Sequence, residues 1–94
     1  MNKISVFWTQ EAENDLDLIY DYYFEKSPIV ALRLINEIIA STESLVFSNQ
    51  YQIEDYKSDC RRIVIKNYKV LYTIEIDSIY IVRVFDSRRS NLTM

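Results

Sequence analysis

Apolar residues recur at helical spacing in the first half of the chain. Between residues 10 and 26 the apolar stripe consists of Ala12, Leu16, Ile19, Tyr20 and Tyr23. Between residues 28 and 47 the stripe consists of Ala31, Leu34, Ile35, Ile38, Thr42 and Leu45. Each set forms one face of an amphipathic helix. Thr9 suits the N-cap of the first helix, and Ser27 followed by Pro28 suits the start of the second. The pattern predicts a helical hairpin with almost no loop.

The remaining apolar segments favour strands. Residues 4–8 predict a first strand, and residues 61–66, 68–76 and 79–85 are rich in β-branched and aromatic side chains. Two-residue turns are predicted at Lys66-Asn67, where Asn67 tolerates a positive φ, and at Asp77-Ser78. Residues 48–60 are polar and lack a clear period, so they predict a loop with a short strand near residues 51–53.

These turns set a strand register. Ile63 is expected opposite Val70, Ile65 opposite Tyr68, Ile74 opposite Ile81, and Ile76 opposite Ile79. The face turned to the helices then carries Ile63, Ile65, Val70, Tyr72, Ile74, Ile79, Ile81 and Phe85. The opposite face, called the outer face below, carries Arg62, Val64, Lys66, Lys69, Leu71, Thr73, Glu75, Tyr80, Val82, Val84 and Asp86. The predicted fold is α+β in the order β-α-α-β-β-β: an N-terminal strand, a helical hairpin and a three-stranded antiparallel meander.

Composition narrows the classes of function. The 94 residues predict a single domain, residues 1–94. The chain has no glycine and no histidine, so we expect no Gly-rich phosphate loop, no zinc site and no cofactor. A lone cysteine, no signal-peptide pattern and no long apolar run indicate a cytoplasmic protein with no membrane segment.

Charge is unevenly distributed although the net charge is only −3. Residues 10–25 carry six carboxylates and no base, whereas residues 57–69 carry five cations against one acid. Such asymmetry is typical either of a local anion-binding face or of a solvated surface of mixed charge. The net charge itself gives no bulk attraction to nucleic acid.

Three motifs in this order resemble the RelE/ParE superfamily of small bacterial toxins. Residues 8–16 (WTQEAENDL) resemble the family's strand-to-helix opening, residues 61–72 (RRIVIKNYKVLY) its paired strands, and residues 79–89 (IYIVRVFDSRR) its last strand and basic end. The resemblance covers residues 3 to about 91. It implies the toxin component of a type II toxin–antitoxin system, with an antitoxin partner.

The resemblance implies one of two activities. RelE-like members cut messenger RNA on the ribosome without a metal, and ParE-like members poison DNA gyrase. For a RelE-like chain, Arg62, Lys69 and Arg89 match catalytic basic positions. Val64 replaces a further lysine, however, and no tyrosine follows Tyr80. Arginine is a poor base, so cations for phosphate binding survive better than groups for proton transfer. Tyr56, Lys57 and Asp86 are conceivable substitutes.

We therefore favour a ParE-like toxin over a RelE-like endoribonuclease, which leaves open whether the chain is an enzyme. A non-toxic binding module derived from such a toxin is a third possibility, and the basic residues would then be ordinary surface residues. For the antitoxin, the predicted contact residues are Leu71, Tyr80, Val82, Val84 and Arg88, which would suit an acidic amphipathic segment.

Overall fold

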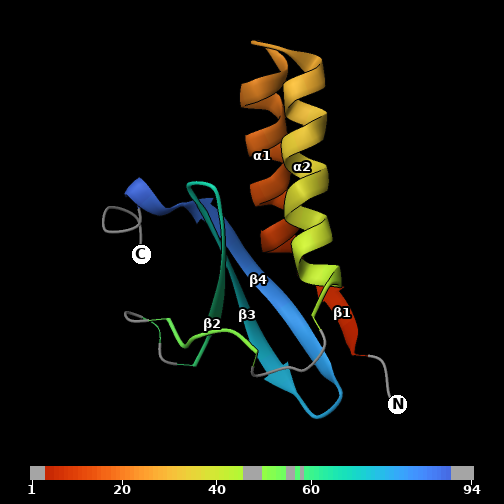
Figure 1. The fold of residues 1–94 in the computed structure, drawn as a ribbon, viewed down its shortest axis with the longest axis vertical. Helices are drawn as coiled ribbons and strands as arrows, with labels where there is room; N and C mark the ends of the chain where they lie inside the picture. Colours follow the sequence, from red (N-terminus) through yellow and green to blue (C-terminus); the bar gives the residue numbers. More distant parts are fainter. Residues whose placement is uncertain (1–3, 46–49, 55–56, 58, 90–94) are drawn as a thin grey trace.

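A helical hairpin covers one face of a four-stranded sheet in the computed structural model (Figure 1). The structure describes residues 4–45, 50–54, 57 and 59–89. The elements are β1 (Ser5–Trp8), α1 (Gln10–Phe24), α2 (Pro28–Glu43), β2 (Arg61–Ile65), β3 (Tyr68–Glu75), β4 (Ser78–Asp86) and a 3₁₀ turn, η1 (Ser87–Arg89). This order confirms the predicted α+β fold. No helix in the described part of the chain is long and apolar enough to cross a membrane.

The helix starts are those predicted. The Thr9 hydroxyl accepts a hydrogen bond from the Ala12 amide at 3.2 Å, and the Ser27 hydroxyl accepts one from the Val30 amide at 3.3 Å. The Thr9 hydroxyl also donates to the Ile81 carbonyl at 2.9 Å, which fixes the start of α1 against β4. The second helix ends at Glu43, earlier than predicted, and residues 46–47 of the predicted helix lie outside the described residues.

The strand order is β1-β4-β3-β2, with β1 parallel to β4 and the other pairs antiparallel. Ile63 lies opposite Val70 and Ile65 opposite Tyr68, as predicted. The positive φ in the turn between β2 and β3 belongs to Lys66, at 56°, and not to Asn67. The sequence did not predict where the first strand lies in the sheet. In the structure β1 is an edge strand and lies beside β4.

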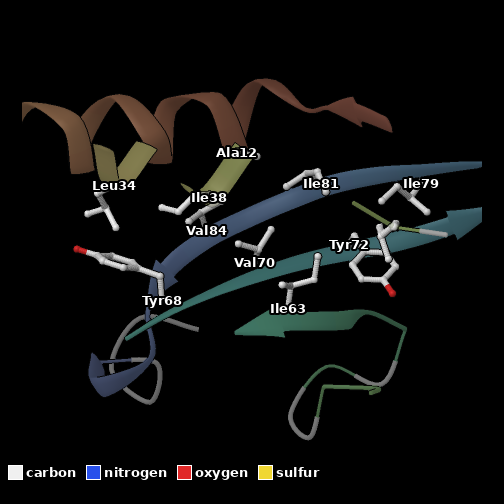
Figure 2. Close-up of a cluster of buried hydrophobic side chains, with 11 residues drawn as sticks. Ala12, Leu34, Ile38, Ile63, Tyr68, Val70, Tyr72, Ile79, Ile81 and Val84 are labelled. Atoms are coloured by element: carbon white, nitrogen blue, oxygen red, sulfur yellow. The ribbon is translucent and has the colours of Figure 1, made fainter. Parts of the chain in front are cut away.

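The core lies between the helical hairpin and the sheet. In Figure 2, Leu34 of α2 points toward Tyr68, and Ile38 of α2 points toward Val84 of the sheet. Tyr72, Ile79 and Ile81 extend this cluster along β3 and β4 and are fully buried. The cluster therefore joins both helices to the three longer strands.

The predicted register between β3 and β4 is wrong in two respects. The turn is formed by residues 76–77, so Ile74 pairs with Ile79 and not with Ile81. Ile76 is 95% exposed, so it has no packing partner that would have constrained the turn.

The second error concerns a β-bulge. Leu71 pairs with Arg83 and Tyr72 with Ile81, so Val82 is an extra residue in β4. The bulge reverses the predicted faces of the residues after it. Val84 pairs with Val70 and lies in the core, whereas Phe85 pairs with Lys69.

Asp15 of α1 holds the backbone next to this bulge. Its Oδ2 accepts hydrogen bonds from Arg83 Nε and from the Val84 amide, both at 2.8 Å. We expect Asp15→Ala to lower the free energy of unfolding by about 2 kcal/mol, because the Val84 amide and the Arg83 guanidinium lose a charged acceptor. Urea unfolding would measure this. Asp17→Ala, on the exposed side of the same helix, is the control and should stay within about 0.5 kcal/mol of the wild type.

Candidate functional site

A buried carboxylate lies between two of the three cations to which the resemblance to RelE-like toxins gave a catalytic role. Glu54 Oε2 accepts from Lys69 Nζ at 2.9 Å, and Oε1 accepts from Lys69 Nζ at 3.1 Å and from Arg62 Nη1 at 3.3 Å. The Glu54 side chain has no exposed area, and those of Arg62 and Lys69 are 18% and 19% exposed. We call Glu54, Arg62 and Lys69 the outer-face triad.

Pairing along the free edge of β2 brings Glu54 to this position. Ile53 forms an antiparallel bridge with Arg61, the Arg62 amide donates to the Gln52 carbonyl at 2.9 Å, and the Glu54 amide donates to the Cys60 carbonyl at 2.8 Å. This bridge agrees with the short strand predicted near residues 51–53. Alternation along β2 then puts Glu54 beside Arg62 on the outer face of the sheet.

The guanidinium of Arg62 also holds the rest of this segment. Its Nη1 donates to the Ile53 carbonyl at 2.7 Å, and its Nη2 donates to the Gln52 side-chain oxygen at 2.9 Å. The neighbouring Arg61 Nη1 donates to the Tyr51 carbonyl at 2.6 Å. The segment 51–54 is therefore tied to β2 by arginine side chains as well as by backbone hydrogen bonds.

The structure brings Arg62 and Lys69 together, as the register predicted, but already paired with an acid. Two cations at this spacing could bind the charge of a phosphate. In the triad Glu54 balances one of their two positive charges. The Glu54 carboxylate could in principle act as a base, but its buried oxygens do not reach the surface in this arrangement.

The other residues considered for catalysis do not join the triad. Arg89 ends η1, and the structure does not describe its side chain. Lys57 pairs with Asp59 at 3.6 Å, whereas Asp86, opposite Tyr68 at the end of β4, bonds Arg88. Tyr56 lies outside the described residues.

The predicted antitoxin contacts are not all on one accessible surface. Leu71 is fully buried, and Val84 is buried in the core because of the bulge, so neither offers its side chain to the surface. Tyr80 is 36% exposed and stacks on Phe7 with ring centroids 5.3 Å apart. Val82 is half-buried and Arg88 is exposed.

A groove of about 780 Å³ lies between α1 and the end of β4. Apolar and aromatic side chains line most of it: Leu18, Ile19, Tyr22, Tyr23, Tyr68, Val84 and Phe85. Burial and the Tyr23 hydroxyl, 3.3 Å away, raise the pKa of Tyr68. Asp15, Asp86 and Arg88 complete the lining. We call this feature the α1 groove.

The ion pair between Arg88 and Asp86 in the α1 groove shifts a pKa that can be measured. Arg88 Nη2 donates to Asp86 Oδ2 at 2.7 Å and lowers the pKa of Asp86 to about 2. A carboxyl whose pKa is lowered in the folded state stabilises it above the unfolded pKa, and that stability is lost as pH falls from about 4 toward 2. We expect Arg88→Gln to raise the Asp86 pKa toward its ordinary value of about 3.9, as followed by carboxyl carbon NMR. Arg33→Gln, on α2, should leave this pKa unchanged.

Sequence reasoning missed Glu54 and the α1 groove. Glu54 lies in a polar segment without a period, where a single carboxylate looks like any solvated acid. The groove contains Tyr22 and Leu18, which lie off the predicted apolar stripe of α1. Their exposure on a helix that otherwise carries acids is the one signal that could have indicated a binding surface.

Comparison with known families identifies one that covers most of the chain. Residues 6–91 match the family profile described as the ParE toxin of the type II toxin–antitoxin system parDE. A chain of the chromosomal ParDE toxin–antitoxin system from P. aeruginosa superposes with a TM-score of 0.79 at 25% identity, covering 88% of this chain and 95% of that one.

More distant structures share the fold. A chain of the RelBE2 toxin–antitoxin complex from Mycobacterium tuberculosis gives a TM-score of 0.62 at 16% identity, covering 92% of this chain and 93% of that chain. A solution structure of a hypothetical protein from Helicobacter pylori gives 0.61 at 16% identity, covering 90% of this chain and 96% of that one. No curated protein sequence matches the chain significantly.

Proposed function

Because the chain belongs to the ParE toxin family of type II toxin–antitoxin systems, we propose that it arrests growth in the cytoplasm by poisoning DNA gyrase and that a cognate antitoxin neutralises it. The observation that carries the choice of target is the outer-face triad. Messenger RNA cleavage needs unneutralised cations and a base in reach of the ribose, and here Glu54 occupies the cation pair. A gyrase poison needs neither.

Expression from a tightly controlled promoter tests the choice of target. We expect growth arrest with intact transcripts and an induced DNA-damage response. We also expect purified chain to inhibit gyrase supercoiling in vitro. Co-expression of the antitoxin is the control and should restore growth.

Two other results would replace this proposal. Arrest with cleaved transcripts would identify a RelE-like endoribonuclease, and the search for its base would begin with Glu54. Folded protein without any arrest would identify a non-toxic binding module.

We propose the α1 groove as the antitoxin-binding surface. Leu18 is 69% exposed and Tyr22 is 58% exposed beside the groove, so a partner could bury both. Asp17 and Asp21 lie exposed on the same helix. An apolar segment flanked by basic residues would therefore suit this surface better than the acidic segment expected on the outer face.

Leu18→Glu tests this surface. We expect the substitution to raise the Kd for the cognate antitoxin at least about tenfold, because it places a charge where an apolar contact forms. Isothermal titration calorimetry would measure it. Leu32→Glu is the control, since Leu32 is 55% exposed but lies on α2 outside the groove. Equal losses of affinity for both variants would argue against the α1 groove.

A further inference from the structure

Burying a carboxylate is costly unless strong interactions compensate. Among the residues that the structure describes, Glu54 is the one charged residue in the fully buried set. Its oxygens take hydrogen bonds from two cations that lie on neighbouring strands, Arg62 on β2 and Lys69 on β3. A role in keeping the protein surface soluble does not explain why this carboxylate is buried.

Contacts other than those of the Glu54 carboxylate also anchor the segment 51–54. Arg62 already bonds the Ile53 carbonyl and the Gln52 side chain, and backbone hydrogen bonds join Gln52 and Glu54 to β2 and Cys60. The carboxylate gives Lys69 an acidic contact, with both oxygens within 3.1 Å of Nζ. Its distinct effect is therefore on the charge of the outer face.

The carboxylate lies where a bound oxyanion would lie. It offers two oxygens to one ammonium and one guanidinium, as a phosphodiester would. The cations are about four-fifths shielded from solvent, so an anion held between them would be only weakly screened. Glu54 is thus placed as an internal substitute for a phosphate.

We propose that Glu54 closes an oxyanion site formed by Arg62 and Lys69, and that this carboxylate excludes the phosphodiester backbone of single-stranded RNA from the outer face. Glu54 is then a specificity-determining residue. The inference rests on the proposed function, since it explains how a chain that keeps this cation pair would leave RNA alone.

Glu54→Ala is the main test. The substitution removes both the charge and the side chain that fills the oxyanion site. We expect its affinity for a short fluorescein-labelled single-stranded RNA, measured by anisotropy, to rise at least about tenfold over the wild type. The gain should fall with added salt, as for a phosphate contact. Adding Lys69→Met to Glu54→Ala should abolish the gain.

Glu37→Ala is the matched control. It makes the same change in net charge, and Glu37 likewise pairs with a lysine, Lys66, at 3.0 Å, but at an exposed site. Its RNA affinity should equal that of the wild type. Circular dichroism would establish that each variant is folded. If Glu54→Ala does not fold, Glu54→Asp takes its place. The shorter acid keeps its charge but draws back from Lys69, so it should show a smaller gain than expected for Glu54→Ala.

Two results would overturn the inference. One is a folded Glu54 variant that binds RNA no better than Glu37→Ala does. The other is tight RNA binding by the wild type that Lys69→Met abolishes, since the site would then be open. Gyrase inhibition by the wild type, measured in parallel, separates this inference from the proposed function. A wild type that leaves gyrase active overturns the target but not the role of Glu54, whereas inhibited gyrase with no gain of RNA binding overturns only the role of Glu54.

Discussion

Replacing Lys69 with methionine is expected to lower the free energy of unfolding by about 3 kcal/mol, because it leaves a buried carboxylate without its main partner. Glu54 Oε2 loses the hydrogen bond from Lys69 Nζ at 2.9 Å, and Oε1 keeps the longer one from Arg62 at 3.3 Å. The Glu54 side chain has no exposed area, so water does not replace the lost donor. A loss of this size is large against the 5–15 kcal/mol typical of a folded domain.

Adding Glu54→Gln to Lys69→Met should recover about 2 kcal/mol of that loss, because the double variant no longer buries a poorly compensated charge. Urea unfolding of the wild type, both single variants and the double variant gives the coupling between the two sites. The slope of the transition should stay constant if the surface exposed on unfolding does not change.

Lys66→Met is the control for this cycle. The Lys66 ammonium also pairs with a glutamate at 3.0 Å, but its side chain is 57% exposed and that of Glu37 is 44% exposed. We expect its loss to stay within about 0.5 kcal/mol. Additive losses at Lys69 and Glu54 would show that the triad is not a coupled unit.

Much of the fold follows from local patterns. Thr9, Ser27 and Pro28 fix the helix starts through side-chain capping and the restricted φ of proline, which depend only on neighbouring residues. The pairing of β2 with β3 follows from a two-residue turn, because strand alternation then determines each opposite residue. That register also placed Arg62 and Lys69 on one face, and the structure brings both to Glu54.

The bulge in β4 could not be predicted from alternation. Val82 is as good a strand residue as its neighbours, and nothing in its composition marks it as extra. The position of the bulge depends on packing against α1. Asp15 of α1 bonds the Arg83 side chain and the Val84 amide, which follow Val82 directly. A contact between residues 69 positions apart decides which face Val84 takes.

Glu54 could not be recognised for a related reason. It precedes Arg62 by 8 residues and Lys69 by 15, and its segment has no period of its own. Its burial depends on the pairing of that segment with the edge of β2, which composition does not reveal. The family resemblance therefore identified the two cations of the site, and the strand register placed them on one face. Glu54 joins them only through tertiary pairing.

Truncation of the core on α2 should have an effect of similar size to the loss of Lys69. Ile38 is fully buried and points toward the sheet (Figure 2). We expect Ile38→Ala to lower the free energy of unfolding by about 3 kcal/mol, through lost burial and the cavity that remains. Urea or thermal unfolding of the chain alone would measure it.

Ile29→Ala is the matched control for Ile38→Ala. It is the same substitution on the same helix, but Ile29 is 69% exposed, so its loss should stay within about 0.5 kcal/mol. Equal losses would contradict the packing of α2 described above.

Comparing Ile38→Ala with Leu18→Glu also separates effects on stability from effects on function. Ile38→Ala should reduce toxicity only by reducing the folded population, and a bound antitoxin should largely restore its folding by mass action. Leu18→Glu should instead weaken antitoxin binding while the chain itself stays as stable as the wild type.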